Sequence, residues 1–320
     1  MLTFLITGGA GFIGSHLSER LMSQGHSVIG LDNFNDYYDP QVKRANLKEL
    51  LQQPSYRLIE ADILETNKLD RVFAEHRFDV IVHLAARAGV RPSLSQPILY
   101  EQVNCLGTLN LLERARDHRV SKFIFSSSSS VYGNNKKVPF SEEDPVDHPV
   151  SPYAATKKAG EQICYTYHHL YGLPITCLRF FTVYGPRQRP DMAISKFTRL
   201  IARGEKVPLY GDGSTKRDFT FISDIVDGIE KSIQHCTSYH IYNLGESRTI
   251  DLKSLIRLLE DCLEKRAIVE QLPNQPGDVP ITYADVSKAR REIGYDPQVD
   301  INEGVRRYVQ WYRETAAAQQ

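Results

Sequence analysis

A glycine-rich loop near the N-terminus limits the folds open to this chain more than any other feature. A short apolar run leads into T-G-G-A-G-F-I-G at Thr7–Gly14, and a helical pattern over Ser15–Gln24 follows. Gly8 and Gly11 let the backbone turn and approach a pyrophosphate, and Gly14 lets the helix pack closely on the strand. Free N–H groups at the helix N-terminus favour phosphate. The loop predicts a dinucleotide site; a turn without a ligand is the alternative.

The first half of the chain alternates apolar runs of strand length with helical patterns. The predicted strands are Leu2–Thr7, Ser27–Leu31, Tyr56–Glu60, Phe78–Leu84, Lys122–Ser126 and Ile175–Phe180. The predicted helices are Ser15–Gln24, Gln102–Asp117 and Ser151–Leu170. This alternation is typical of βαβ units, which form a parallel sheet with helices on both faces. We therefore predict a Rossmann-like, doubly wound α/β fold.

The regular alternation of strand and helix patterns ends after Thr182. Longer polar loops separate helices predicted at Met192–Arg203, Ile222–Gln234, Leu252–Glu264 and Val286–Ile293. No linker divides two independent units. We predict a cofactor-binding Rossmann domain over residues 1–181, which also carries the reactive side chains. Residues 182–320 are predicted to form a smaller, interwoven α/β lobe for the substrate.

An acidic residue after the second predicted strand suits a nicotinamide dinucleotide. Asp32 lies 18 positions past Gly14, close to the separation expected in a dinucleotide-binding unit. Its carboxylate would accept a hydrogen bond from a ribose 2′-hydroxyl and repel a 2′-phosphate. The cofactor predicted from this residue is NAD rather than NADP.

Composition argues against several other classes of function. Lys plus Arg and Asp plus Glu number 39 each, so nothing indicates a nucleic-acid or membrane-surface partner. No apolar run is long enough to span a bilayer, and the N-terminal residues lack the features of a signal peptide. The five cysteines and ten histidines show no metal-ligand spacing. We expect a cytoplasmic protein without a metal site.

Tyr153 and Lys157 are the candidate catalytic residues. Four positions apart, they share one face of a predicted helix, where the ammonium is expected to lower the pKa of the phenol toward neutrality. A phenolate near neutral pH can take a proton from a sugar hydroxyl, which allows hydride to leave the same carbon. The serine run Ser126–Ser130 follows the fifth predicted strand, where open parallel sheets bind ligands.

Three longer motifs carry a family resemblance. They are TGGAGFIGSHL at Thr7–Leu17, SSSSVYG ending at Gly133, and SPYAATKKAGE at Ser151–Glu161. Together they resemble the nucleotide-sugar epimerases of the extended short-chain dehydrogenase/reductase family, over essentially the whole chain. The resemblance implies that Ser128 hydrogen bonds Tyr153, with Ser127 as the alternative within the serine run. It also implies that the second lobe binds the nucleotide sugar.

Two positions of the serine run separate neighbouring reactions of that family. Ser129 and Ser130 stand where members that eliminate water carry an Asp-Glu pair and where members that decarboxylate a glucuronate carry a Glu. No additional carboxyl acid is therefore expected beside Tyr153. Oxidation followed by return of the hydride, which is epimerisation, is the simplest reaction left.

Two further segments indicate the sugar. Asp32–Asp39 and Thr182–Ala193 most resemble the UDP-glucuronate 4-epimerases, which convert UDP-glucuronate to UDP-galacturonate through a rotating 4-keto intermediate. The resemblance implies that Arg189 binds the C5 carboxylate, a task that suits the planar guanidinium. The alternative is that Arg187 and Arg189 are solvated loop charges.

The resemblance also assigns less specific contacts. Cofactor contacts, apart from those already given, are expected from Phe12, Ile13, Asn33, Asp62, Ile63, Leu84, Ala85, Ala86 and Asn104, and Lys157 is expected on the nicotinamide ribose. Substrate contacts are expected from Arg87, Ser93, Ser128, Thr182, Arg189, Arg217 and Asp278. Arg217 would hold the UDP diphosphate; a surface ion pair is the alternative. Ser93 could equally be an ordinary loop serine.

Three questions stay open at this point. A UDP-glucose/UDP-galactose 4-epimerase is the alternative enzyme, and a catalytically silent NAD-binding protein is the alternative from another class. Family members commonly form homodimers by pairing two helices per subunit, here Gln102–Asp117 and Ser151–Leu170.

Overall fold

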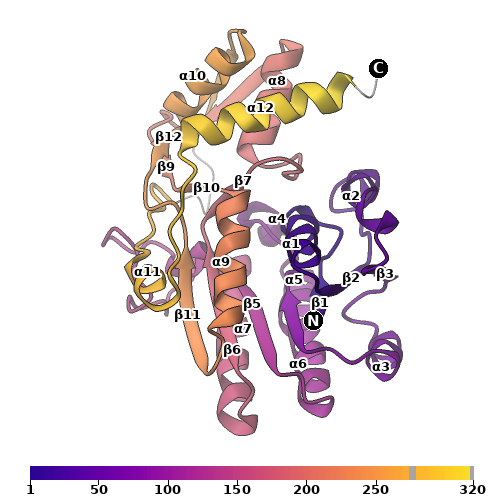
Figure 1. Ribbon diagram of the computed structural model, residues 1–320. Coiled ribbons are helices and arrows are strands. Elements are labelled where there is room, and N and C mark those ends of the chain that lie inside the picture. Colours follow the sequence, from indigo (N-terminus) through magenta and orange to yellow (C-terminus); the bar gives the residue numbers. More distant parts are fainter. Residues whose placement is uncertain (274–278, 318–320) are drawn as a thin grey trace.

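Seven parallel strands form the central sheet of the computed structural model, which describes residues 1–273 and 279–317 (Figure 1). Their order is β11-β6-β5-β4-β1-β2-β3. The strands are β1 (Thr3–Thr7), β2 (Ser27–Asp32), β3 (Tyr56–Glu60), β4 (Val80–His83), β5 (Lys122–Ser128), β6 (Ile175–Phe180) and β11 (Tyr239–Leu244). The predicted doubly wound α/β fold is confirmed.

Helices cover both faces of this sheet, so each strand buries side chains on two sides. In β1, Phe4 and Ile6 belong to the core on one face, while Leu5 belongs to the core on the other. Helices α1 (Phe12–Ser23) and α9 (Ile222–Gln234) supply the first core. Helices α3 (Thr66–Glu75), α6 (Gly107–Asp117) and α7 (Pro152–Tyr171) supply the second.

The strand order reverses between β1 and β4, and this reversal sets the position of the site. Strand β1 pairs with β2 on one side and with β4 on the other. Connections that leave in opposite directions open a crevice beyond the carboxyl ends of the strands. Thr7 and His83 end the two strands there, and Ser128 ends β5 beside them.

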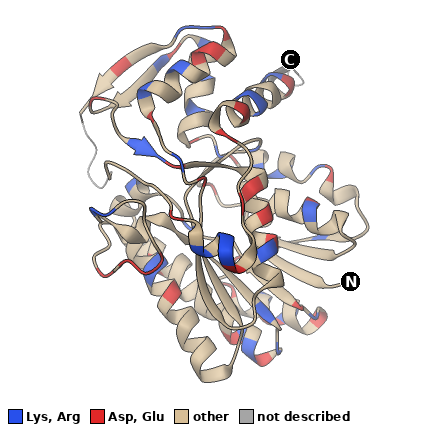
Figure 2. Ribbon diagram, turned by 60° about the vertical axis from the view of Figure 1, so that its left-hand side comes forward, with Lys and Arg blue, Asp and Glu red and all other residues tan. Residues whose placement is uncertain are grey.

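The lobe built from the second half of the chain consists of short pieces. Its helices are α8 (Ala193–Arg203), α10 (Leu252–Leu263), α11 (Ser287–Ile293) and α12 (Ile301–Ala317). Its strands pair two by two: β7 (Thr182–Tyr184) with β10 (Phe219–Phe221), β8 (Lys206–Tyr210) with β13 (Ile268–Leu272), and β9 (Lys216–Arg217) with β12 (Ile250–Asp251). Charged residues lie mainly on helices and loops, and the central strands carry few (Figure 2).

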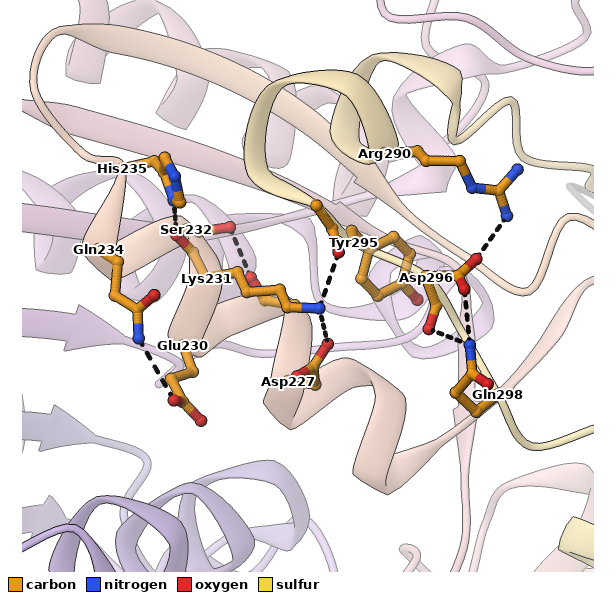
Figure 3. A network of polar contacts seen from close by, with 12 residues as sticks. Asp227, Glu230, Lys231, Ser232, Gln234, His235, Arg290, Tyr295, Asp296 and Gln298 are labelled. Atoms are coloured by element: carbon orange, nitrogen blue, oxygen red, sulfur yellow. Dashed lines mark hydrogen bonds and ion pairs between the residues drawn. The ribbon is translucent and has the colours of Figure 1, made fainter.

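Helix α9 ties this lobe to the Rossmann half. Lys231 lies between Asp227 and the carbonyl of Gly294, at distances of 2.9 and 2.7 Å (Figure 3). The preceding residue, Glu230, accepts hydrogen bonds from Arg20 of α1 and from Gln24 at its C-terminal end. Helix α9 therefore contacts both the smaller lobe and the Rossmann half.

Several elements were not predicted. They are strand β11 of the central sheet, α2 (Pro40–Asn46), α3, α4 (Val90–Ser95), α5 (Pro97–Glu101), α12, the 3₁₀ turns Leu50–Gln52 and Ser129–Tyr132, and the strands of the small lobe. The helix predicted over Gln102–Asp117 starts with a π turn at Gln102–Leu106. The shortest of these elements escape periodicity because they hold too few residues to show a period. Helix α12 has 17 residues, so its length does not explain why it was missed. Within the described residues, no helix is long and apolar enough to cross a membrane.

Candidate active site

A cavity of about 380 Å³ lies beyond the carboxyl ends of the strands and receives side chains from both halves of the chain. The predicted site residues that line it are Gly8, Gly11, Phe12, Ile13, Gly14, Asp32, Asn33, Asp62, Ile63, Leu84, Ala85, Ala86, Ser128, Tyr153, Lys157, Thr182 and Arg189. The fold thus gathers the glycine loop, the serine run and the Tyr-Lys helix around one space.

The glycine loop forms a backbone surface that fits a pyrophosphate. Gly8 has a φ of +68°, a left-handed conformation that disfavours other residues. A Cβ on Gly14 would lie 2.3 Å from the carbonyl oxygen of Gly8, so only glycine allows α1 to start this close to β1. The first N–H groups of α1 remain available to an anion. These features fit the predicted dinucleotide.

Asp32 lies at the ribose end of the cavity and is paired with a residue that was not predicted. Its Oδ1 accepts hydrogen bonds from the Phe34 N–H at 2.9 Å and from the Lys43 ammonium at 3.0 Å. Both charged side chains are almost fully buried and both line the cavity. A carboxylate beside an ammonium can bind a vicinal diol, because one accepts and the other donates. This arrangement fits the adenine ribose of NAD.

Asn33 and Asp62 close the cavity next to this pair. The amide of Asn33 donates to Oδ2 of Asp62 at 2.6 Å, and Leu64 N–H donates to the other oxygen at 2.8 Å. Each carboxylate oxygen keeps a second lone pair. Asp62 can therefore still accept a hydrogen bond from an adenine amine.

The structure separates the two candidate serines. The Ser127 hydroxyl donates to Glu161 Oε1 at 2.7 Å, and Glu161 is held by Arg179 through two hydrogen bonds of 2.8 and 2.9 Å. All three side chains are buried. The Ser128 hydroxyl, by contrast, lines the cavity together with Tyr153 and acts to lower the pKa of that phenol. It donates to Ser130 Oγ and accepts from the Ser130 N–H, each at 3.1 Å. The geometry therefore favours Ser128 as the hydroxyl partner of Tyr153, with Ser127 anchoring the strand end from behind.

We predicted that Lys157 lowers the pKa of Tyr153 toward neutrality, and for the protein without a ligand this prediction was wrong. Burial raises the pKa of Tyr153 above its usual value, although the Ser128 hydrogen bond and the charge of Arg189 act in the opposite direction. Lys157 donates to the Ser126 carbonyl at 2.6 Å, and burial lowers its pKa to about 8. The loss of water around the phenol outweighs the nearby positive charges.

Thr182 and Arg189 also line the cavity. The guanidinium of Arg189 donates from Nε and Nη2 to Asp191, at 3.0 and 2.8 Å. One face of the same guanidinium lies over the Tyr37 ring, with Cζ 5.2 Å from the ring centroid. Arg189 is therefore a fixed residue of the cavity wall, not the solvated loop charge considered as its alternative.

Arg187 has a different environment from Arg189. It has a left-handed φ of +65°, and its guanidinium binds Glu19 at 2.7 Å on α1. The Pro186 carbonyl also contacts the ring of His16, at 3.0 Å. Arg187 is thus part of a fastening between the loop and α1, and it does not face the cavity.

Four predicted contacts lie outside the cavity lining. Asn104 holds the backbone of Arg87, accepting from its N–H at 2.8 Å and donating to its carbonyl at 3.0 Å. The Ser93 hydroxyl donates to the Val90 carbonyl inside α4. Arg217 lies on β9, where it donates to the Lys216 carbonyl. The predicted contact Asp278, with neighbouring Gln275, lies outside the described residues.

Sequence reasoning also missed several lining residues, among them Asn35, Tyr37, Tyr38, Lys43, Phe180 and Met192. Lys43 had one available signal, a lysine eleven positions past Asp32 on the same segment. The aromatic pair in the segment after Asp32 was used only for the resemblance. No metal-binding group of His, Cys, Asp or Glu occurs among residues 1–273 and 279–317.

Comparison with known proteins adds independent findings. A family model described as GDP-mannose 4,6 dehydratase matches residues 5–308. The UDP-glucuronate 4-epimerase of Thermodesulfobacterium geofontis is 43% identical over 312 residues, covering 97% of this chain and 96% of the relative.

Solved structures show the same similarity. The UDP-glucuronic acid 4-epimerase of Bacillus cereus, in complex with UDP-glucuronic acid and NAD, superposes with a TM-score of 0.92 at 34% identity, covering 98% of this chain and 100% of that one. The UDP-glucose 4-epimerase of Thermotoga maritima, with UDP-glucose, gives 0.91 at 34% identity, covering 98% and 100%. The overall fold thus does not separate the two sugars.

Proposed function

This chain belongs to the GDP-mannose 4,6-dehydratase family of extended short-chain dehydrogenases/reductases, and we propose that it is a UDP-glucuronate 4-epimerase that uses NAD. The observation that carries the proposal is the shared cavity of Tyr153 and Arg189. The first can act as acid and base at the C4 hydroxyl of a sugar, and the second can bind the carboxylate carried by the adjacent ring carbon, C5. A UDP-glucuronate 4-epimerase with high identity over the whole chain supports it.

The mechanism assigns the proton steps to residues of this chain. Tyr153, as the phenolate, removes the proton of the 4-hydroxyl and later returns it, and Ser128 hydrogen bonds the same sugar oxygen. Bound NAD would supply the hydride acceptor and donor for C4, and its positive ring would favour the phenolate. Lys157 would hold the ribose of the cofactor, and the 4-keto sugar would rotate about its diphosphate link between the two transfers. Ser129 and Ser130, in the 3₁₀ turn after β5, supply no acid for a dehydration.

Arg189 has a second task in this mechanism. The 4-keto intermediate of a glucuronate is a β-keto acid, which loses CO2 when the breaking bond aligns with the carbonyl π system. A carboxylate held by Arg189 and Thr182 near the ketone plane resists that loss. Arg189→Ala is expected to raise the fraction of decarboxylated product, measured by chromatography; an unchanged product ratio contradicts this role.

The experiment that tests the function compares two sugars at equal concentration. UDP-glucuronate is expected to yield UDP-galacturonate, separated by chromatography, faster than UDP-glucose yields UDP-galactose. Preference for UDP-glucose supports the alternative enzyme, which the similarity to the Thermotoga maritima epimerase keeps open. No product from either sugar supports the catalytically silent protein.

Three proposals of organisation accompany the function. Residues 1–181 bind NAD, and residues 182–320 bind the nucleotide sugar, with the lobes interwoven. The chain forms a homodimer through α6 and α7; the exposed Ile98 and Leu106, just before α6, support an interface there. Sedimentation gives the mass of the particle, and cell fractionation tests the expected cytoplasmic location.

A further inference from the structure

The loop that follows β2 runs from the ribose end of the cavity to its sugar end. Asn33 Oδ1 accepts a hydrogen bond from the Asn35 N–H, and Asn35 Oδ1 accepts one from the Tyr37 N–H, each at 3.1 Å. These successive side-chain turns fix the course of the loop. Asn33, Asn35 and Tyr37 all line the cavity. A segment that begins at Asp32, beside the ribose site, therefore places an aromatic ring near the reacting sugar.

The Tyr37 ring is held firmly at that position. Its hydroxyl donates to the Ala88 carbonyl at 2.7 Å, and the Tyr100 hydroxyl donates to the same oxygen at 2.7 Å. Gly89 has a φ of +96°, and a Cβ there would lie 3.0 Å from the Tyr37 hydroxyl. The backbone next to Ala88 is thus shaped to accept the phenol.

Two guanidinium groups lie near this one ring. Arg189 Cζ is 5.2 Å from the centroid of Tyr37, and Arg87 Cζ is 5.7 Å from it. Cation–π attraction at partly buried sites is worth about 0.5–2 kcal/mol. Asp191 binds Nε and Nη2 of Arg189, so the ring and the carboxylate restrain the guanidinium from two directions. The charge of Arg189 acts to lower the pKa of Tyr153.

We propose that Tyr37 is a positioning residue that makes the site selective for a sugar carboxylate. Its ring holds the guanidinium of Arg189 in the orientation that meets the C5 carboxylate of the substrate. Without the ring, the long arginine side chain regains rotamer freedom, which binding must then remove. A substrate with a hydroxymethyl group at C5 does not use the guanidinium in this way. The inference rests on the proposed function, because it concerns the same carboxylate.

The test compares binding of two sugars to variants that cannot turn over. UDP-glucuronate and UDP-glucose are titrated calorimetrically into NAD-loaded protein that carries Tyr153→Phe. Adding Tyr37→Leu is expected to weaken UDP-glucuronate about tenfold, from the cation–π range, and UDP-glucose less than about twofold. Tyr37→Phe, which keeps the ring, is expected to stay within about twofold of the parent for both sugars.

Tyr38→Leu is the matched control. Tyr38 is the adjacent aromatic residue and also lines the cavity, but its ring lies near Lys43, 5.5 Å from the ammonium. This change is expected to leave the ratio of the two sugar affinities as it is in the parent. Equal weakening of both sugars by Tyr37→Leu, or no weakening of UDP-glucuronate, overturns the inference. Failure of the proposed function is distinguishable, because wild-type protein would then convert no UDP-glucuronate.

Discussion

His83 and Lys157 are buried ionisable groups of the Rossmann half, whereas those of the smaller lobe include the carboxyls of Asp218 and Glu246. Burial lowers the pKa of His83 to about 3 and that of Lys157 to about 8. In the smaller lobe, burial raises the pKa of Asp218 to about 6 and that of Glu246 to about 7. In both regions burial favours the neutral form.

The neutral form of His83 is explained by its neighbours. The Thr108 hydroxyl donates to the Asn104 carbonyl, so it accepts from the Nε2 of His83 at 3.0 Å. Thr7 then donates to Nδ1, at 2.7 Å. The folded pKa lies below the usual 6.5, so this group contributes stability above 6.5 that is lost as pH falls toward 3.

The carboxyls of the smaller lobe give the opposite trend. Asp218 accepts hydrogen bonds from the N–H groups of Glu246, Ser247 and Ala284, so its carboxylate connects its own segment to two others. Its folded pKa lies above the usual 3.8. The stability it contributes is present below 3.8 and is lost as pH rises through about 6. The contribution of His83 to stability is therefore lost in acid, and that of Asp218 is lost as the pH rises toward neutrality.

The largest expected effect is the loss of kcat when the acid–base residue of the Rossmann half is replaced. Tyr153→Phe removes the acid–base oxygen, and kcat is expected to fall about 10³-fold while NAD binding persists, measured by steady-state assay and calorimetry. Tyr165→Phe, on an exposed position of the same helix, is the control and is expected to keep full activity. Substantial turnover by Tyr153→Phe contradicts the assignment.

The next effect concerns the one buried ion pair behind the serine run. Glu161→Ala leaves the Arg179 guanidinium without its bidentate partner, in a place that is 1% exposed. The expected cost is about 3–5 kcal/mol in the free energy of unfolding, measured by denaturant titration. Lys158→Ala, which removes a longer and partly exposed contact to the same carboxylate, is expected to cost less than about 1 kcal/mol. Equal losses would falsify the view that Arg179 is the essential partner.

Glu246 is expected to contribute to the pH dependence of the free energy of unfolding in the smaller lobe. One oxygen of Glu246, Oε2, is buried without a hydrogen-bond partner among the described residues. Its folded pKa of about 7 exceeds the usual 4.5, so its contribution is lost as pH rises through 7. Glu246→Gln is expected to recover about 3 kcal/mol of unfolding free energy at pH 8 relative to pH 4, at roughly 1.4 kcal/mol per pKa unit.

The control for this prediction is Glu264→Gln, which changes an exposed glutamate of the same lobe. Its stability curve against pH is expected to run parallel to that of the wild type. If Glu246→Gln also gives a parallel curve, another group is responsible for the trend.

The smallest expected effect concerns the contact between the loop that carries Arg189 and helix α1 of the Rossmann half. Arg187→Ala removes the ion pair with Glu19 that fastens the Arg189 loop to α1. The pair is partly exposed, so we expect about 1 kcal/mol or less, seen as a KM for UDP-glucuronate raised a few fold with kcat unchanged. Arg203→Ala, at a more exposed pair of 3.9 Å in the lobe, provides the comparison. Identical KM values for the two variants would show that the Arg187–Glu19 ion pair does not position the Arg189 loop for substrate binding.

Features carried by local sequence could be predicted. The alternation of strands and helices gave the fold, and Gly8, Gly14, Asp32, Tyr153 and Lys157 do line one cavity. Family membership followed from the same motifs and is confirmed by comparison. These residues act within short stretches of backbone, so their spacing alone carries the information.

Features that depend on distant contacts could not be predicted. Tyr37 meets Arg189 across 152 positions of sequence, which no local pattern reports. The raised pKa of Tyr153 depends on its burial, which a helical spacing does not report. Arg87 and Ser93 follow β4 as expected, but they are not among the residues that line the cavity, and local hydrogen bonds hold the Arg87 backbone and the Ser93 hydroxyl.

Transfer of an isotope tests the central claim most directly. UDP-glucuronate that carries deuterium at C4 is incubated with the enzyme in ordinary water, and the product is examined by mass spectrometry and NMR. We predict UDP-galacturonate that retains the deuterium at C4, since one bound dinucleotide takes the label and gives it back. Product that has exchanged the label for solvent hydrogen, or the absence of UDP-galacturonate, contradicts the account.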